Sequence, residues 1–507
     1  MNQRKAGVLL TYFNKFMSIG INLVYVPLLL FYMGKEEYGL YQLMGSVIAY
    51  IGMMDFGFSV AITRFYTKYK ALNDHKSMEN LLATSAVIYI VLGAIITAAG
   101  GVAYCFLEDI FGGALTPAEM ASAKQIFIIL VLGVLVCVEA QIFTAVIVSA
   151  EKFLIQRGIT TVSVILQPIV VLLAMQSSPY AVTFVLVQTI FYTLSTLFQI
   201  YYAFRYLHIS FRFHGYDKEL VKGITGFSLA VFLMTVTDQI FFRSNQLILG
   251  AMSGTLAVAV YAIGSQIYMS YMPLAGIISG VFFPKVTEMV AKKVPMEVFS
   301  ELFIRIGRLQ FLLLGLILSG FVLFGRQFIH FWVGDDFLDA WWVALLVMTP
   351  FTVDIITGLG LTIMQARNDF WFRVKVGLTA AVMNVCLAIP AARYYGGVGC
   401  AAVTCLSLSL CYCLAMNWYY ARRLHLEIKC FWNHIAGICF YVVMAMLLGE
   451  VFARGMSLLP LPAFVGLIFD IVFYVAVYVL LLYHKAFNVY ERGLLQEGLR
   501  RLRGNRG

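Results

Sequence analysis

The sequence predicts an all-α polytopic membrane protein of about fourteen transmembrane helices. Of its 507 residues, 61% are hydrophobic and only 12% are charged, whereas soluble globular proteins are about 45–50% apolar and about 25% charged. The mean hydropathy is +0.86. Apolar runs long enough to cross a bilayer core, which takes about 20 residues, recur along the whole chain between short polar connections.

Each apolar run is predicted to form one helix, with ends uncertain by several residues. The runs are 7–33, 40–62, 81–107, 124–148, 157–176, 181–204, 223–249, 255–280, 303–325, 340–364, 373–392, 399–420, 434–453 and 463–483. The first run is too long for the apolar part of a signal peptide and is expected to be a retained helix. An even number of helices places both termini on one side of the membrane.

Lysine and arginine fix the orientation, because cytoplasmic connections retain them. Of the 36 in the chain, 29 lie in the segments on the side of the N-terminus and 5 on the other side, while Lys15 and Arg243 lie inside helices. Both termini are therefore predicted to be cytoplasmic. The net charge of +10 is explained mostly by topology, so a nucleic-acid partner is not expected.

The connections are too short to hold a separate catalytic domain; the longest external ones are 108–124 and 326–339. The nine cysteines show no zinc spacing and the histidines are scattered, so no metal site is expected. No G-x-x-x-x-G-K-[ST] loop for nucleotide phosphates is present. A separate catalytic domain and direct hydrolysis of ATP are therefore not expected.

The first hairpin carries a polar site. A stripe with spacings of 4, 3, 4 and 3 lies on one face of the first helix and consists of Thr11, Lys15, Ser18, Asn22 and Tyr25. A lysine deep inside such a helix requires protein or a wet cavity around it. Asp55 in the second helix lies at similar depth, so Lys15 is either a ligand contact or the ion-pair partner of Asp55.

An internal duplication is visible when the chain is shifted by 220 residues. The shift matches Gly34 with Gly254 and Tyr41 with Tyr261. It also places Asp238 and Asn245 of the seventh helix on the face that corresponds to the Lys15 face. The fourth and tenth helices each carry one acid in mid-helix, Glu139 and Asp354. Six helices separate the halves, so the repeat is parallel, an architecture found among secondary transporters.

Several short motifs, in order along nearly the whole chain, carry a family resemblance. They are MGKEEYGLY at 33–41, DFG at 55–57, LG at 249–250, VAVYA at 258–262, FPK at 283–285 and YGGVGCAA at 395–402. With these motifs the chain resembles the oligosaccharide flippases of the multidrug/oligosaccharidyl-lipid/polysaccharide (MOP) exporter superfamily. The resemblance implies two pseudo-symmetric six-helix lobes around a central cavity, at 1–222 and 223–433, two further helices in 434–483, and a basic cytoplasmic tail at 484–507.

The resemblance also implies a function. Such a protein flips a polyprenyl-diphosphate-linked oligosaccharide from the cytoplasmic to the outer leaflet of the bacterial cytoplasmic membrane, with other glycan-assembly membrane proteins as partners. Relatives hold the diphosphate with several cations. This chain departs from that pattern, because its helices contain Lys15 and Arg243 but also Asp55, Glu139, Asp238, Asp354 and Asp470.

Two sets of candidate site residues follow. The expected substrate-binding residues are Lys15, Ser18, Asn22, Arg64, Asp238, Asn245 and Arg305. The candidates for binding a coupling proton or sodium ion are Asp55, Glu139 and Asp354; no other cofactor is expected. Each has a structural alternative: a cytoplasmic-end arginine such as Arg64 or Arg305 can simply obey topology, and a mid-helix acid can bind a hydroxyl within its lobe.

Three rival functions remain open. A cation-coupled multidrug exporter of the same superfamily is favoured by the buried acids and disfavoured by the number of helices. A peptidoglycan-precursor flippase would use the same fold. A membrane glycan polymerase or ligase would need a sizeable external loop, which the chain lacks.

The predicted topology can be tested by labelling single cysteines introduced into a variant without the nine native ones. Cysteines at Ser178 and Asp336 should react in intact cells with a membrane-impermeant thiol reagent, and cysteines at Asn73 and His214 should react only after the membrane is opened. Labelling of Asn73 or His214 in intact cells would reverse the orientation.

Overall fold

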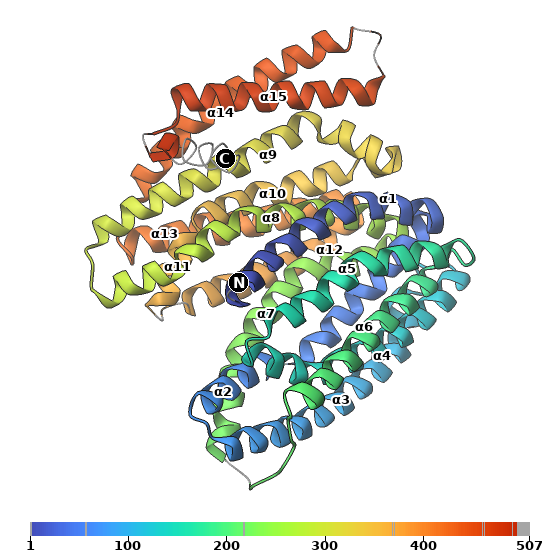
Figure 1. Cartoon of the computed structure of the whole chain (residues 1–507). Coiled ribbons are helices and arrows are strands. Elements are labelled where there is room, and N and C mark those ends of the chain that lie inside the picture. Colours follow the sequence, from blue (N-terminus) through green and yellow to red (C-terminus); the bar gives the residue numbers. More distant parts are fainter. Residues whose placement is uncertain are drawn as a thin grey trace, which may run out of the picture. The chain divides into compact units, whose positions relative to one another are not determined.

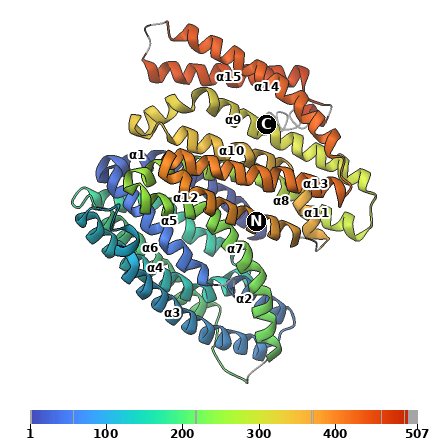
Figure 2. The same cartoon turned by 180° about the vertical axis from the view of Figure 1, so that it is seen from behind.

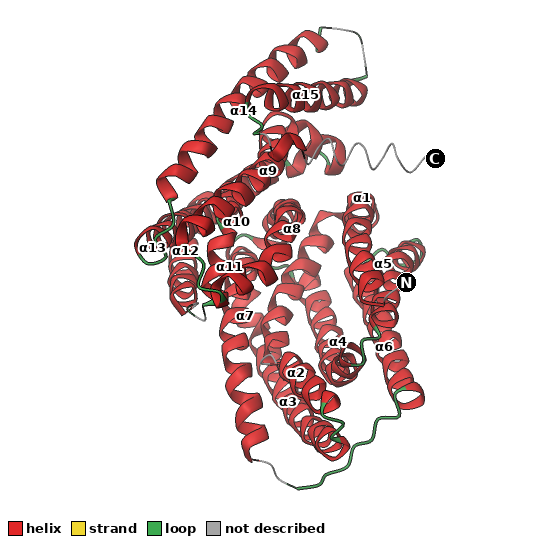
Figure 3. Ribbon diagram, turned by 60° about the vertical axis from the view of Figure 1, so that its left-hand side comes forward, coloured by secondary structure: helices red, strands yellow, loops and turns green. Residues whose placement is uncertain are grey.

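A computed structural model describes residues 3–55, 58–215, 218–367, 369, 371–458, 460, 462–488 and 490–493. Within these residues every regular element is helical and no strand occurs (Figure 3). The predicted all-α class is confirmed. In a bilayer this is expected, because a helix satisfies its own backbone hydrogen bonds where no water is available.

Fifteen α-helices follow one another along the described chain. They are α1 (Gln3–Gly52), α2 (Phe58–Ala71), α3 (His75–Phe111), α4 (Pro117–Ser149), α5 (Phe153–Met175), α6 (Ala181–Tyr206), α7 (Lys218–Met252), α8 (Gly254–Ala291), α9 (Met296–Val333), α10 (Ala340–Ile356), α11 (Gly358–Ala366), α12 (Trp371–Leu408), α13 (Met416–Arg422), α14 (Ile428–Met456) and α15 (Ala463–Lys485).

These helices account for the fourteen predicted transmembrane segments. Ten helical stretches of the described chain are long and apolar enough to cross a membrane, and two of them, Phe13–Gly52 and Trp371–Arg422, contain a sharp kink. The kinks lie at Gly34 (φ 78°) and Gly396 (φ 57°), where each stretch divides into two predicted segments. The helices α7 and α8 supply the remaining two. The predicted segment 340–364 is divided at Thr357 into α10 and α11.

Local sequence signals explain where two of the helices begin. Thr116 and Glu119 form a reciprocal capping box at the start of α4, with Pro117 in the first turn. Asp74 caps α3 by accepting hydrogen bonds from the backbone and hydroxyl of Ser77, at 3.0 and 2.6 Å. These two bonds hold the pKa of the Asp74 carboxyl below its usual range.

The chain divides into two compact units. The first comprises residues 1–262 and 392–397, and the second comprises residues 263–391 and 398–507. In the first unit α4 packs on α3 and α6, and α1 packs on α5 and α7 (Figure 1). In the second unit α14 and α15 lie side by side along α9, as views from both sides agree (Figure 2). The helix α7 packs with α1 and therefore belongs to the first unit, so the boundary between the two units differs from the expected division at 222. The two six-helix lobes stay a prediction.

Three pairs of matched positions give structural support for the internal repeat. Gly34 and Gly254, which the shift of 220 residues superimposes, both have φ of 78°. Asn245 donates a 2.7 Å hydrogen bond to the hydroxyl of Tyr261. Their counterparts Tyr25 and Tyr41 both contact the ring of Phe184, at centroid distances of 6.4 and 4.4 Å. The same positions thus join consecutive helices in both halves.

Small residues allow α1 to approach α7 and α8 closely within the first unit. A Cβ atom added to Gly39 would lie 2.0 Å from the carbonyl oxygen of Thr255, and one added to Gly250 would lie 2.2 Å from the Leu43 side chain. Backbones in contact maximise van der Waals packing, the main attraction between helices that share a lipid solvent.

Replacing Gly39 by alanine should therefore destabilise the protein, since the new methyl group would meet backbone that cannot move aside. Overpacking of this kind costs about 1–3 kcal/mol. Gly45→Ala is the matched control in the same helix, because a Cβ atom added to Gly45 would meet no atom within 4 Å. Thermal unfolding of the detergent-purified variants should show a lowered midpoint for Gly39→Ala alone. An unchanged midpoint would contradict the close approach.

Candidate functional site

A polar hollow lies between α2 and α4 in the first unit, with a volume of about 610 Å³. Its lining residues are Ser59, Val60, Thr63, Arg64, Thr67, Gln141, Thr144 and Ala145. Arg64 is the single charged residue among them. The α2 members recur every fourth residue, so consecutive turns of that helix present a continuous polar face.

The hydroxyl groups around the hollow donate their hydrogens within the protein. Thr63 and Thr67 donate to carbonyl oxygens one turn earlier, at 2.9 and 2.7 Å. Thr144 donates to the Gln199 side chain at 2.6 Å. Their oxygen lone pairs are left as acceptors, while the guanidinium of Arg64 and the amide of Gln141 supply donors. Such a surface suits a ligand that combines an anionic group with hydroxyl donors.

Two acids flank the buried Tyr89 close to the hollow: Asp55, one turn before Ser59, and Glu139 on α4. Asp55 accepts hydrogen bonds from Ser59, at 3.0 Å, and from Tyr89, at 2.8 Å. Tyr89 is fully buried. Glu139 is close enough for its charge to act on Tyr89, and it packs against Gly93. Glu139 makes no hydrogen bond or ion pair with any described residue, so among the three predicted coupling acids it alone lacks a hydrogen-bond or ion-pair partner.

The expected pairing of Lys15 with Asp55 is not observed. Asp55 is bonded to Ser59 and Tyr89 instead, and Lys15 is exposed on α1 without an ion pair to the described residues. The stripe itself is partly preserved, because Asn22 donates to Ser18 at 3.4 Å. Lys15, Ser18 and Asn22 therefore present one polar face.

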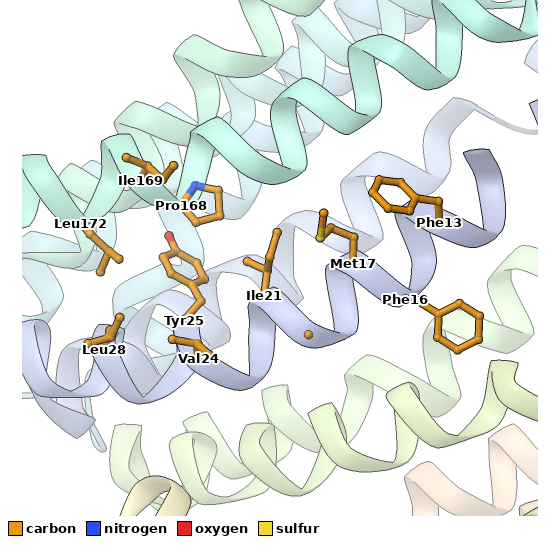
Figure 4. A pocket seen from close by; sticks show the side chains of 11 residues that line it. Phe13, Phe16, Met17, Ile21, Val24, Tyr25, Leu28, Pro168, Ile169 and Leu172 are labelled. Atoms are coloured by element: carbon orange, nitrogen blue, oxygen red, sulfur yellow. The ribbon is translucent and has the colours of Figure 1, made fainter. Parts of the chain in front are cut away.

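Tyr25 departs from that stripe. It is buried and lines an apolar groove of about 550 Å³ between α1 and α5 (Figure 4). Its ring points toward Pro168, and its hydroxyl has no hydrogen-bond partner among the described residues. At 100° per residue, the groove-lining Val24 lies about 180° from Lys15 around α1, whereas Ser18 lies only about 20° from Tyr25. Lys15 thus turns away from this groove, and Ser18 lies at its edge.

Two of the expected substrate-binding residues make contacts within the protein instead. Asn245 is completely buried and bonded to Tyr261, so it has no surface to offer a ligand. Arg305 lies over the ring of Tyr490, with its guanidinium carbon 2.9 Å from the centroid, so it holds the end of the described chain. The side chain of Asp238 lies outside the described part, and its role stays a prediction.

Asp354 differs from the coupling acid expected at its position. Both of its oxygens accept from Arg373, at 2.7 and 2.9 Å, and the guanidinium also stacks on Tyr412, 3.6 Å from the ring centroid. A bidentate pair of this kind leaves the carboxylate little capacity for a cation. Among the described residues, no group of three or more histidines, cysteines or acids could hold a metal ion.

Sequence reasoning missed Tyr89, Gln141 and the hydroxyls of α2, because it weighed charged residues first. The spacing of Asp55, Ser59 and Thr63 at intervals of four was visible in the sequence. It could have identified the polar face of α2, although not the helix opposite.

Comparison with solved structures shows a shared fold. The lipid II flippase MurJ in an inward closed conformation matches with a TM-score of 0.74 and 13% identity, over 97% of this chain and 99% of that one. An inward-facing multidrug resistance MATE transporter of the MOP superfamily matches with a TM-score of 0.66 and 13% identity, over 82% and 95%. A MOP superfamily transporter from Pyrococcus furiosus matches with a TM-score of 0.57 and 12% identity, over 85% and 97%.

Sequence comparison is more specific. No curated protein matches the chain in sequence. The sequence profile of the family described as polysaccharide biosynthesis protein matches residues 5–290, more than half of the chain. This segment contains the polar face of α1, the hollow beside Arg64 and the acids around Tyr89. The chain therefore belongs to the polysaccharide biosynthesis protein family and has the fold of the MOP superfamily transporters.

Proposed function

We propose that this protein flips a polyprenyl-diphosphate-linked oligosaccharide, the repeat unit of a surface polysaccharide, from the cytoplasmic to the outer leaflet by alternating access. The observation that carries the proposal is the hollow beside Arg64, which combines one cation with hydroxyl and amide groups. Arg64 would bind the diphosphate by charge-assisted hydrogen bonds. The hydroxyl oxygens would accept hydrogens from sugar hydroxyls, and the polyprenyl chain would stay in lipid.

The exposed face of Lys15, Ser18 and Asn22 is the second proposed contact surface. Its lysine has no ion pair to the described residues, so its charge is available to a phosphate. An unpaired cation inside an apolar helix is costly and therefore a functional candidate. The repeat matches Asp238 to this face, and we propose that its carboxylate binds hydroxyl groups of the sugar.

The matched family favours a polysaccharide precursor over the rivals. MurJ, described as a lipid II flippase, supports the alternative of a peptidoglycan precursor through its fold alone. The multidrug MATE transporters support a drug exporter in the same way, through their fold alone. Glu139 lacks a hydrogen-bond or ion-pair partner among the described residues. It favours the drug exporter only if it binds a coupling ion.

Replacing Arg64 by alanine should lower flipping at least tenfold in reconstituted vesicles that contain a polyprenyl-diphosphate oligosaccharide. Hydrogen bonds to a charged group contribute about 1.5–3 kcal/mol, which is a factor of about ten or more. Arg64→Lys should retain part of the rate, because the charge remains while the planar fork is lost. Flipping would be measured as the fraction of substrate accessible to an external sugar-modifying enzyme.

Lys68→Ala is the matched control for the loss of charge, since Lys68 is exposed one turn further along α2 and does not line the hollow. An equal loss in that variant would assign the effect to topology. A well-folded Arg64→Ala protein that flips at the normal rate would refute the proposed site. Vesicles with lipid II or a cationic dye in place of the oligosaccharide distinguish the rival substrates.

Glu139→Gln should abolish any acceleration of flipping by a proton or sodium gradient while leaving substrate binding intact. The neutral amide keeps the shape of the side chain but cannot bind a cation by charge. Asp354→Asn should not reproduce this result, because Asp354 is held by Arg373. Normal gradient dependence in the Glu139→Gln protein would remove the coupling role.

A further inference from the structure

A second pocket, of about 320 Å³, lies in the other compact unit, at one end of α9, α14 and α15. Its lining residues are Arg308, Asn433, His434, Gly437, Ile438, Tyr441, Lys485 and Ala486. The three helices lie side by side at this point (Figures 1 and 2). Among the described residues, two permanent cations and a histidine line the pocket, and no acid does.

Arg308 forms a wall of the pocket and is already neutralised. Its side chain is 8% exposed and donates to Glu491 at 2.8 and 2.9 Å, and to the carbonyl of Ala486 at 2.8 Å. Glu491 also accepts from the backbone of Asn488 at 2.8 Å. Both carboxylate oxygens are thereby occupied, so this acid is directed at Arg308 and not at the pocket. The bond to Ala486 fixes the backbone beside Lys485.

Three polar side chains remain for a ligand. Lys485 is exposed and makes no hydrogen bond or ion pair with a described residue. His434 has Nδ1 2.8 Å from the carbonyl oxygen of Cys430. That bond assigns the ring hydrogen to Nδ1 and leaves Nε2 for the pocket, where it donates when the ring is protonated. Asn433 adds an exposed amide. An ammonium, an imidazole and an amide, around a space that no described acid lines, are groups that bind a phosphate.

The opposite side of the pocket is apolar and continues along the membrane. Ile438 and Tyr441 line it, and further along the face of Tyr441, α14 exposes Met444 and Leu448 at 38% and 46%. A ligand with a phosphate on one end and hydrocarbon on the other therefore matches both sides. The pocket also lies at the helix ends predicted to be cytoplasmic, where the leaflet is anionic.

We propose that this pocket binds the phosphate of an anionic phospholipid headgroup, with the acyl chains along α14. The proposal is independent of the flipping reaction, since the pocket shares no residue with the hollow beside Arg64. A bound lipid would join the ends of α9, α14 and α15, whereas the Arg308–Glu491 pair joins α9 to the segment after α15.

Gly437 provides a sharp test because a Cβ there meets no atom within 4 Å. Gly437→Leu should fill the pocket without displacing protein, and should abolish saturable binding of fluorescent phosphatidylglycerol to the full chain in detergent. Lys485→Gln should weaken that binding about fivefold, the effect of one lysine at an anionic surface. Gly466→Leu and Lys429→Gln are matched controls on α15 and α14, and both should bind normally.

Competitors identify the source of the phosphate. Unlabelled phosphatidylglycerol should compete and phosphatidylcholine should not, while inorganic phosphate should compete only weakly because it lacks the chains. Competition by polyprenyl phosphate alone would assign the pocket to the substrate and overturn the phospholipid proposal. Undiminished binding in the Lys485→Gln protein would also overturn it, and that substitution of an exposed side chain does not threaten folding.

Discussion

The cost of an unpartnered polar group in lipid is the constraint on which the structure depends. It requires helical backbone almost everywhere, and it requires a partner for nearly every charge inside the helices. Asp55 is bonded to Ser59 and Tyr89, Asp354 to Arg373, and Arg308 to Glu491. The exceptions stand out for that reason. Lys15, Glu139 and Asp470 have neither a hydrogen bond nor an ion pair among the described residues, and the first two belong to the part of the chain that matches the family profile.

The fold could be predicted almost completely from the sequence, because hydropathy reports on lipid exposure directly. The predicted helices correspond to helical stretches of the structure, although 40–62 is interrupted between Gly52 and Phe58 and 340–364 at Thr357. Gly34 and Gly396 fall where two apolar runs meet. The matched φ angles of Gly34 and Gly254 were also foreseeable from the repeat. The boundary between compact units was not, because it depends on which helices α7 packs against, and hydropathy contains no information on that choice.

The site was harder to predict, because a side chain's partner depends on packing between distant segments. Asp55 and Lys15 lie at similar depth, yet Tyr89, 34 residues along the chain, takes the carboxylate. Arg305 and Arg308 follow the charge rule for cytoplasmic ends, and nothing in their spacing indicates that Tyr490 and Glu491 occupy them. Asn245 shares the periodicity of a cavity face, but its amide is bonded to Tyr261. Periodicity gives a face of a helix and not what covers that face.

The two mid-helix acids Glu139 and Asp354 differ in their surroundings. In the second unit Asp354 is held by both arms of Arg373, which is itself stacked on Tyr412, so this charge is part of the packing. In the first unit Glu139 remains without a hydrogen-bond or ion-pair partner among the described residues, beside Tyr89 and Asp55. An acid held by arginine does not change charge during transport, whereas an acid without such a partner can exchange a cation. If a coupling ion is used, it is therefore expected in the first unit, within a turn or two of the hollow that contains Arg64.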